Sequence, residues 1–294
     1  MNTEEQTMTI NSHSLKEHGV MNAVYPAQIR SGVLEIQRAC EAFYSLPLEA
    51  KRLLPYQQFD AESGAGYEYK DNENQSGISP LTRDFKENLH LKMKYLGWLR
   101  EKAEASNEPV IVELVEAYAS FMGQLAPWVS EIATAIEEQH GIPGLARDVL
   151  ANQDLWVLRS LHYFGDRNAD AELAKPHTDK CCFTPHLYEN DSGLERLTYE
   201  NAWVPMPVGE GETAIIPGMQ LQNISDNELR ATWHRVKANE HTAVAGRFSM
   251  VCFVTAANRP FIDSARAGRM QDLGVGSTYR LPLEEVRKLF KTSE

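Results

Sequence analysis

Residues 177–188 read HTDKCCFTPHLY, and the interpretation of the whole chain starts from this stretch. His177 and Asp179 stand two positions apart, and in an extended strand residues i and i+2 point to the same face. An imidazole and a carboxylate would therefore converge on one point, while Thr178 would point away. Taken alone, the pair fits a solvated histidine beside a turn aspartate equally well, so its meaning depends on the surrounding sequence.

Short apolar runs that are typical of β-strands occupy the second half of the chain. They are DLWVLRSLHYF at 154–164, CCFTPHLY at 181–188, AWVPM at 202–206, TAIIPG at 213–218 and RFSMVCFV at 247–254. Clusters of Gly, Pro, Asn and Asp separate them, and several short strands at this spacing indicate a β-sandwich or a double-sheet barrel. We expect a mainly β fold with flanking helices and a double-stranded β-helix (jelly-roll) core.

Two later stretches support the interpretation of the His177–Asp179 pair as part of a metal site. His234, in ATWHRV, follows after several predicted strands, so a jelly roll can bring it beside the pair. Two histidines and one carboxylate on one face of a metal leave other positions open, which suits iron(II) that must admit a co-substrate and O2. Arg247 and Ser249 share a strand face, and a guanidinium fork with a hydroxyl suits a carboxylate. The plain alternative for Arg247 is a surface arginine at a strand start.

The first half of the chain has helical patterns. Apolar residues recur at helical spacing over 32–46, with Pro47 following. A longer helix should start near Ser106–Asn107 and stop at Gly141, with Pro127 kinking or interrupting it. Between these helices, residues 55–100 are rich in Gly, Asn, Tyr and charge. We expect them to be irregular, with a strand near 89–95.

The expected organisation is one domain over residues 1–294. Residues 1–150 form a mainly helical N-terminal region, 151–260 the jelly-roll core, and 261–294 a segment with a C-terminal helix at 282–290. No internal repeat or low-complexity linker suggests a second unit.

Composition excludes several classes of protein. The net charge of −12 argues against a nucleic-acid-binding surface, which would carry a surplus of Lys and Arg. No run of apolar residues approaches a membrane span, and no signal peptide is visible, so we expect a cytoplasmic protein. The four cysteines contain no CxxC pair, which leaves reduced, mostly buried thiols as the expectation.

The order HTD, HRV, RFS resembles the isopenicillin N synthase-like branch of the iron(II)/2-oxoglutarate oxygenases. Other stretches are similar to that family in the same order, from about His13 to Pro260. They are SLKEHGV at 14–20, FYSLPLEAK at 43–51, GYEY at 66–69, DFKE at 84–87 and LRSLHYF at 158–164. The chain departs from the family at Leu161, where an Asn is usual, and at Lys180 with the cysteines after it. These departures affect the finer co-substrate contacts and the subfamily.

The resemblance implies Fe(II), 2-oxoglutarate as co-substrate, and O2. It implies His177, Asp179 and His234 as metal ligands, Arg247, Ser249 and Tyr163 as 2-oxoglutarate contacts, and no further catalytic residue. His186, Lys180 and Arg83 are candidate substrate contacts, for which a hydrogen-bonded core histidine and solvated charges are the plain alternatives. The implied reaction is oxidation, by hydroxylation or by desaturation or cyclisation, through a ferryl intermediate. Asp179 argues against halogenation, because related halogenases have a small residue at that position.

The expected partner is a small-molecule substrate, a small to medium-sized metabolite such as those of secondary metabolism, with neither nucleic acid nor membrane involved. Two other functions stay open. One is an iron oxidase of the same fold that needs no 2-oxoglutarate. The other is a catalytically silent binding module on a jelly-roll scaffold, which an intact triad of ligands disfavours.

Overall fold

The computed structural model describes residues 10–60, 63–69, 86–169, 171–209 and 211–259. Arg83 and the expected C-terminal helix at 282–290 lie outside the described residues.

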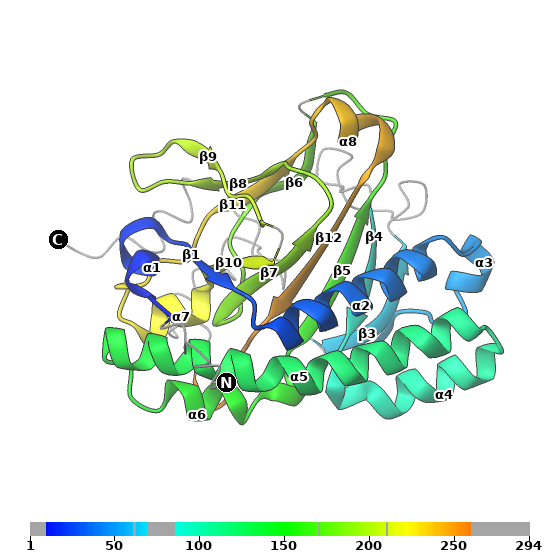
Figure 1. Cartoon of the computed structure of the whole chain (residues 1–294), viewed down its shortest axis with the longest axis horizontal. Helices are drawn as coiled ribbons and strands as arrows, with labels where there is room; N and C mark the ends of the chain where they lie inside the picture. Colours follow the sequence, from blue (N-terminus) through cyan, green and yellow to red (C-terminus); the bar gives the residue numbers. More distant parts are fainter. Residues whose placement is uncertain (1–9, 61–62, 70–85, 170, 210, 260–294) are drawn as a thin grey trace, which may run out of the picture.

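An eight-stranded antiparallel sheet lies at the centre of the molecule, between the long helices and a smaller sheet (Figure 1). Its order is β1 (Met21–Val24), β10 (Glu212–Pro217), β7 (Phe183–Glu189), β12 (Arg247–Phe253), β5 (Val157–Tyr163), β4 (Lys86–Leu91), β3 (Ser63–Tyr69) and β2 (Gln57–Asp60). A four-stranded sheet lies over part of it, in the order β6 (Glu172–His177), β11 (His234–Lys237), β8 (Leu194–Leu197) and β9 (Trp203–Pro205). Two antiparallel sheets of this kind confirm the expected jelly-roll core with flanking helices.

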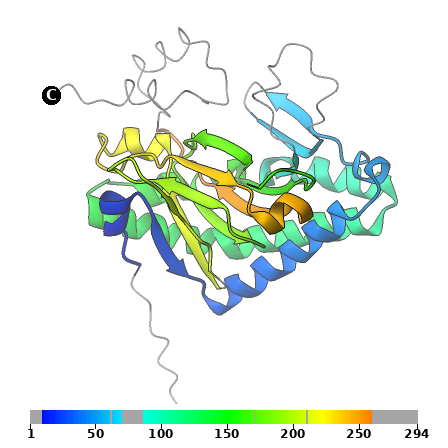
Figure 2. The same ribbon diagram turned by 90° about the horizontal axis from the view of Figure 1, so that it is seen from above.

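Helices cover the outer face of the large sheet (Figures 1 and 2). The helices of the described residues are α1 (His13–His18), α2 (Ala27–Tyr44), α3 (Leu48–Lys51), α4 (Leu96–Ser106), α5 (Pro109–His140), α6 (Leu145–Leu150), α7 (Met219–Ile224) and α8 (Glu240–Ala245), with short 3-10 turns η2 (Met93–Tyr95) and η3 (Gln153–Leu155). The long helices α2, α4 and α5 run along this face, whereas α8 caps the start of β12.

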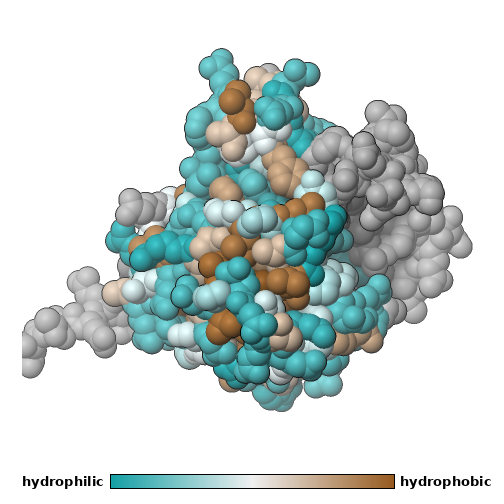
Figure 3. Space-filling model, turned by 90° about the vertical axis from the view of Figure 1, so that its right-hand side faces the viewer, coloured by the Kyte–Doolittle hydropathy of each residue, from teal (hydrophilic) through white to brown (hydrophobic). Residues whose placement is uncertain are grey.

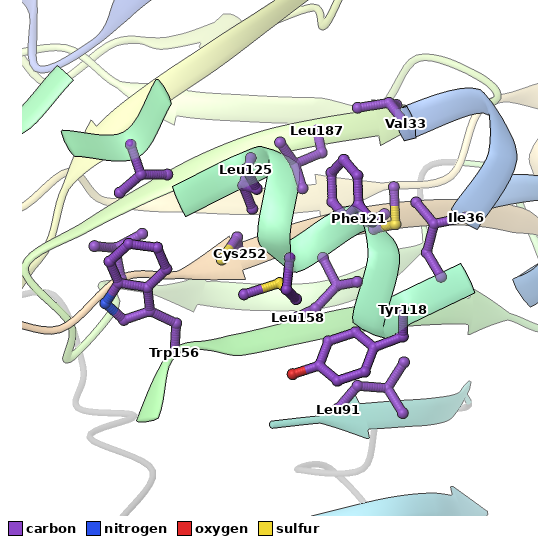
Figure 4. Packing of buried hydrophobic residues seen from close by; sticks show 14 of the residues in the cluster. Val33, Ile36, Leu91, Tyr118, Phe121, Leu125, Trp156, Leu158, Leu187 and Cys252 are labelled. Atoms are coloured by element: carbon purple, nitrogen blue, oxygen red, sulfur yellow. The ribbon is translucent and has the colours of Figure 1, made fainter. Parts of the chain in front are cut away.

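The large sheet separates two hydrophobic cores. The outer core joins the helices to the sheet; Tyr118, Phe121 and Leu125 of α5 pack toward Leu158 and Cys252 (Figure 4). The inner core fills the space between the two sheets and contains Leu161, Tyr163, Ala214, Ile216, Val236 and Val251. Because successive strand residues face opposite sides, Leu158 of β5 belongs to the outer core and Leu161 and Tyr163 to the inner one.

Helix α5 agrees with the sequence prediction at its end but not at its start. Gly141 ends it in the left-handed conformation, as expected, and Pro109 is its first residue. The N-cap, however, is Glu108, whose carboxylate accepts from the Val110 amide, and Asn107 instead ends α4 with a φ of 52°. The helix continues through Pro127, so the predicted interruption is wrong.

The region expected to be irregular, 55–100, is more ordered than predicted. The strand expected near 89–95 is β4, a few residues earlier, and it joins β3 and β5 in the large sheet. Helix α4 begins at Leu96 and was not predicted. The N-terminal region is thus less purely helical than expected, since it supplies β1 to β4.

Polar groups cover most of the side of the molecule shown in Figure 3, with apolar groups exposed in its middle. Among the described residues, no helix is long and apolar enough to cross a membrane. Cys40, Cys181, Cys182 and Cys252 are all buried free thiols, as expected, and burial raises the pKa of Cys40 to about 12.

Candidate metal centre

His177, Asp179 and His234 form a compact cluster. His177 ends β6 and lies directly opposite His234 of β11 in the strand register, with ring centroids 4.3 Å apart. Oδ1 of Asp179 is 4.0 Å from Nε2 of His177 and 3.9 Å from Nε2 of His234. One possible ligand atom from each residue lies within 4.8 Å of the others. Donors at this spacing can surround one ion at bonds of about 2.0–2.2 Å.

Backbone carbonyls orient both imidazoles. Nδ1 of His177 lies 2.7 Å from the Lys175 carbonyl, and Nδ1 of His234 lies 3.1 Å from the Thr232 carbonyl. Since a carbonyl only accepts hydrogen bonds, each Nδ1 carries the proton and each Nε2 keeps its lone pair toward Asp179. This second hydrogen bond is what fixes the tautomer of metal-binding histidines.

The Asp179 carboxylate is held from the large sheet. The Thr184 hydroxyl on β7 donates to Oδ2 at 2.6 Å, which leaves Oδ1 facing the histidines. The Asp179 carbonyl accepts from the Met219 amide at 2.8 Å. Gly218 lies so close that a Cβ would stand 2.0 Å from the Cys181 carbonyl oxygen. Sequence reasoning missed Thr184 and Gly218, because their contacts depend on how the large sheet lies against the loop after β6.

Arg247 begins β12 on the face that looks between the two sheets. It pairs with Tyr163 in the register, and Ser249 pairs with Leu161, so the three predicted 2-oxoglutarate contacts share one face. Arg247 is almost fully buried, its Nη2 is ion-paired with Glu189 of β7, and its Nε donates to the Asp191 carbonyl at 3.1 Å. The surface alternative for Arg247 is wrong.

Glu189 was not anticipated from the sequence. Burial raises the pKa of its carboxyl, while the adjacent Arg247 and the Val208 amide, which donates to it at 2.9 Å, act in the opposite direction. The register between β7 and β12 shifts at Met250–Val251, close to the pairing of Glu189 with Ser249. The alternation of inward and outward side chains along a strand does not predict such a shift.

Several donors near Arg247 suit a bound carboxylate. Within the described part of the chain, Nη1 of Arg247 and the Ser249 hydroxyl form no hydrogen bond. Nε2 of His186, also on β7, is buried and has no partner there either. The His186 ring meets that of His234 edge-on at 5.7 Å, and burial, His234 and Arg247 lower its pKa, which keeps the imidazole neutral. These polar atoms without hydrogen-bond partners lie near both the metal cluster and the buried arginine. Their arrangement suits a small dicarboxylate as a ligand.

The other candidate residues are placed as follows. His186 faces the space between the sheets, a placement that fits both a substrate contact and a core histidine. Lys180 directly follows Asp179 in the loop before β7. His162 is a structural residue, because its Nδ1 lies 2.7 Å from buried Glu87 on the helix side of the sheet. His241 is exposed, and its Nδ1 lies 2.6 Å from Oδ2 of Asp191.

Comparisons with known proteins agree with this geometry. Residues 155–256 match the family model of the 2OG-Fe(II) oxygenase superfamily. No curated protein matches the sequence.

Solved structures share the fold across most of the chain. A protein of Shewanella oneidensis, provisionally described as an oxygenase, is 24% identical with a TM-score of 0.67, over 89% of this chain and 93% of that one. Neurospora crassa T7H in complex with alpha-KG is 19% identical with a TM-score of 0.67, over 83% and 77%. The dioxygenase for auxin oxidation (DAO) of rice is 20% identical with a TM-score of 0.64, over 91% of each. At these identities the likeness establishes the fold.

A double-sheet barrel that gathers two histidines and an aspartate between its sheets defines the class of non-haem iron oxygenases. The match over 155–256 covers all of these residues and the buried arginine. Residues 155–256 thus carry the domain of the 2OG-Fe(II) oxygenase superfamily, and the protein is a dioxygenase that uses Fe(II), 2-oxoglutarate and O2.

Proposed function

We propose that this dioxygenase oxidises a small to medium-sized metabolite, with His177, Asp179 and His234 holding Fe(II). The observation that carries the ligand assignment is the direct pairing of His234 with His177 across β11 and β6, with Oδ1 of Asp179 within 4.0 Å of both rings. When bound, the iron and its co-substrate supply the oxidation, and the protein supplies placement.

We further propose that Arg247 and Ser249 bind the far carboxylate of 2-oxoglutarate, and that Tyr163 closes the site from the neighbouring strand. Nη1 of Arg247 and the Ser249 hydroxyl are available as donors, while Nη2 and Nε are fixed by Glu189 and the Asp191 carbonyl. An arginine held in this way offers its remaining N–H groups without further loss of side-chain freedom. His186 is proposed to line the space that co-substrate and substrate share.

Hydroxylation is the proposed reaction type, and desaturation or cyclisation would use the same residues. Asp179 occupies the third ligand position, so no room is left there for a halide. T7H of Neurospora crassa has been crystallised in complex with alpha-KG and thymine. A substrate of similarly small size is compatible with a site that lies between two sheets.

The architecture also supports the proposal of a single domain over residues 1–294. Strands β1 to β4, from the N-terminal region, pair into the same sheet as β5, β7, β10 and β12 from the proposed core. Folding of the core without those strands would leave two sheet edges exposed.

An anaerobic titration tests the proposal. Adding Fe(II) and then 2-oxoglutarate to the protein should produce a visible metal-to-ligand absorption band, and Asp179→Ala should abolish it. Absence of the band in the wild-type protein would favour the silent binding module. Succinate is then measured aerobically with metabolite mixtures, with and without added 2-oxoglutarate. Undiminished substrate oxidation without 2-oxoglutarate would instead establish the alternative iron oxidase.

A further inference from the structure

Arg159 lies on β5 and faces the space between the two sheets. It alternates with the inner-core residues Leu161 and Tyr163, and it pairs in the register with Val251 of β12, also an inner-core residue. Its guanidinium carbon lies 4.6 Å from the centre of the Phe253 ring. The proposed roles of the neighbouring residues do not use Arg159.

The charge of Arg159 is not neutralised by a carboxylate in direct contact among the described residues. Across the described residues it forms no hydrogen bond and no ion pair, and its Nε atom is buried. Burial lowers the pKa of Arg159, while the more distant carboxylates of Glu68 and Asp179 oppose the shift. Arginine stays charged in proteins, and buried charges are normally paired. A buried guanidinium without a carboxylate partner is able to bind an anion.

A second unpartnered group lies on the neighbouring strand. Oδ1 of Asn88 on β4 is buried and has no hydrogen-bond partner in the described structure. Its Nδ2 donates to Glu68 at 3.0 Å, and Nε2 of His90 lies 3.2 Å from the same carboxylate oxygen. Glu68 is thereby hydrogen-bonded to β4 and acts on Arg159 only through its charge, without a direct ion pair. Since Arg159 pairs with His90 and Leu161 with Asn88, Arg159 and Asn88 are diagonal neighbours on one face.

This face continues directly into the proposed co-substrate site. Ser249 of β12 is opposite Leu161, and Arg247 is opposite Tyr163, so Arg159 lies further along the same face of β5. Val251 of β12 pairs with Arg159 on one side and with His186 on the other, and the His186 ring lies 5.7 Å from that of His234, so this face adjoins the metal cluster. A molecule held by Arg159 would lie beside the metal without displacing the group on Arg247.

We propose that Arg159 binds a carboxylate of the substrate that is oxidised, and that Asn88 accepts a hydrogen bond from a hydroxyl or N–H group of the same molecule. The substrate class is a small organic acid with a hydrogen-bond donor. This assignment rests on the proposed function, because it places the acid next to the metal cluster. The competing explanation is a structural arginine stacked on Phe253.

Thermal stability separates the two explanations without knowledge of the substrate. Arg159→Met keeps the length and apolar packing of the side chain but removes the charge. If Arg159 is an unpaired binding group, the variant should melt higher, by about 2–5 °C, because an uncompensated buried charge is lost. A structural cation stacked on Phe253 predicts a lower Tm instead. Arg100→Met is the matched control, since Arg100 is exposed and ion-paired with Glu116.

Binding of matched acids and amides tests the ligand class directly. The probes are 4-hydroxybenzoate, 4-hydroxyphenylacetate and indole-3-acetate, each paired with its amide, added anaerobically to the protein loaded with Fe(II) and 2-oxoglutarate. The readout is the dissociation constant, from calorimetry and from the perturbation of the absorption band. At least one acid should bind 10-fold or more tightly than its amide, and Arg159→Met or Arg159→Gln should remove that preference while the affinity for 2-oxoglutarate stays unchanged.

Two results overturn the assignment. One is equal binding of acid and amide across all pairs in the wild-type protein. The other is an acid preference that survives in the folded Arg159→Met or Arg159→Gln variant. Both presuppose a normal absorption band, so they are distinct from failure of the proposed function, in which the wild-type protein forms no band.

Discussion

The two oxygens of the Asp179 carboxylate have different environments. Oδ1 faces the two histidines, whereas Oδ2 accepts the Thr184 hydroxyl. The pair His177–Asp179 was predictable because its i, i+2 spacing is local. Thr184 and Glu189 were not, because their contacts depend on how β7 lies against the loop after β6 and against β12. Sequence spacing therefore identifies the candidate ligands but not the residues that orient them.

Thr184→Val should weaken iron binding without unfolding the protein. Valine has the shape of threonine but cannot donate to Asp179, and loss of such an orienting hydrogen bond reduces metal affinity about 10- to 100-fold. The measurement is an anaerobic Fe(II) titration followed by metal analysis. Thr134→Val is the control, because the Thr134 hydroxyl donates only to the Ser130 carbonyl of its own exposed helix turn. An unchanged iron affinity in Thr184→Val would show that the hydrogen bond from Thr184 does not contribute to metal binding by Asp179.

Arg247→Gln should raise the dissociation constant for 2-oxoglutarate by about 10- to 100-fold, because a charge-assisted hydrogen bond to the carboxylate is lost. Glu189→Gln should act in the opposite direction. It removes a buried negative charge that competes for Arg247, while the Asp191 carbonyl still holds Nε. Both constants come from the anaerobic absorption band. Weaker binding in Glu189→Gln would mean that the ion pair orients the arginine and does not compete.

Among the secondary-structure elements, α5 shows where periodicity succeeds and where it fails. Its apolar stripe and its end at Gly141 are local signals, and both are confirmed. Its path through Pro127 is not local, since packing of Tyr118, Phe121 and Leu125 against the sheet outweighs the hydrogen bond that proline removes. Long-range packing also explains why the strands within 55–100 were not predicted. β4 pairs with β5, which lies far along the chain, and β3 then pairs with β4.

Pro127→Ala should therefore stabilise the protein. Proline is about 3 kcal/mol less favourable than alanine inside a helix, and part of that is offset by its restriction of the unfolded chain. We expect the free energy of unfolding to rise by about 1–3 kcal/mol in urea titrations. Pro109→Ala is the matched control, because the first helical position tolerates proline and no gain is expected there. Equal gains at both sites would mean that α5 is not strained at Pro127.

At the scale of the whole molecule, the metal cluster joins parts that are otherwise separate. His177 and His234 belong to the small sheet. Asp179 is held by the Thr184 hydroxyl of the large sheet and by the Met219 amide at the start of α7. The sequence predicted the jelly roll and the order of the ligands along it. It could not predict that the cluster ties the two sheets together, because the division into sheets follows from long-range pairing.

Metal binding should consequently stabilise the entire fold. A ligand that binds only the folded state at about 100 times its dissociation constant adds about 2.7 kcal/mol. We expect Mn(II) with 2-oxoglutarate, used to avoid oxidation, to raise the Tm of the wild-type protein by several degrees over protein treated with a chelator. Asp179→Ala should show no shift, because the cluster has lost its bridge to the large sheet, while Thr134→Val should behave as wild type. A full Tm shift in Asp179→Ala would mean that the metal acts at another site, and the link between the two sheets would then be carried by their hydrophobic core alone.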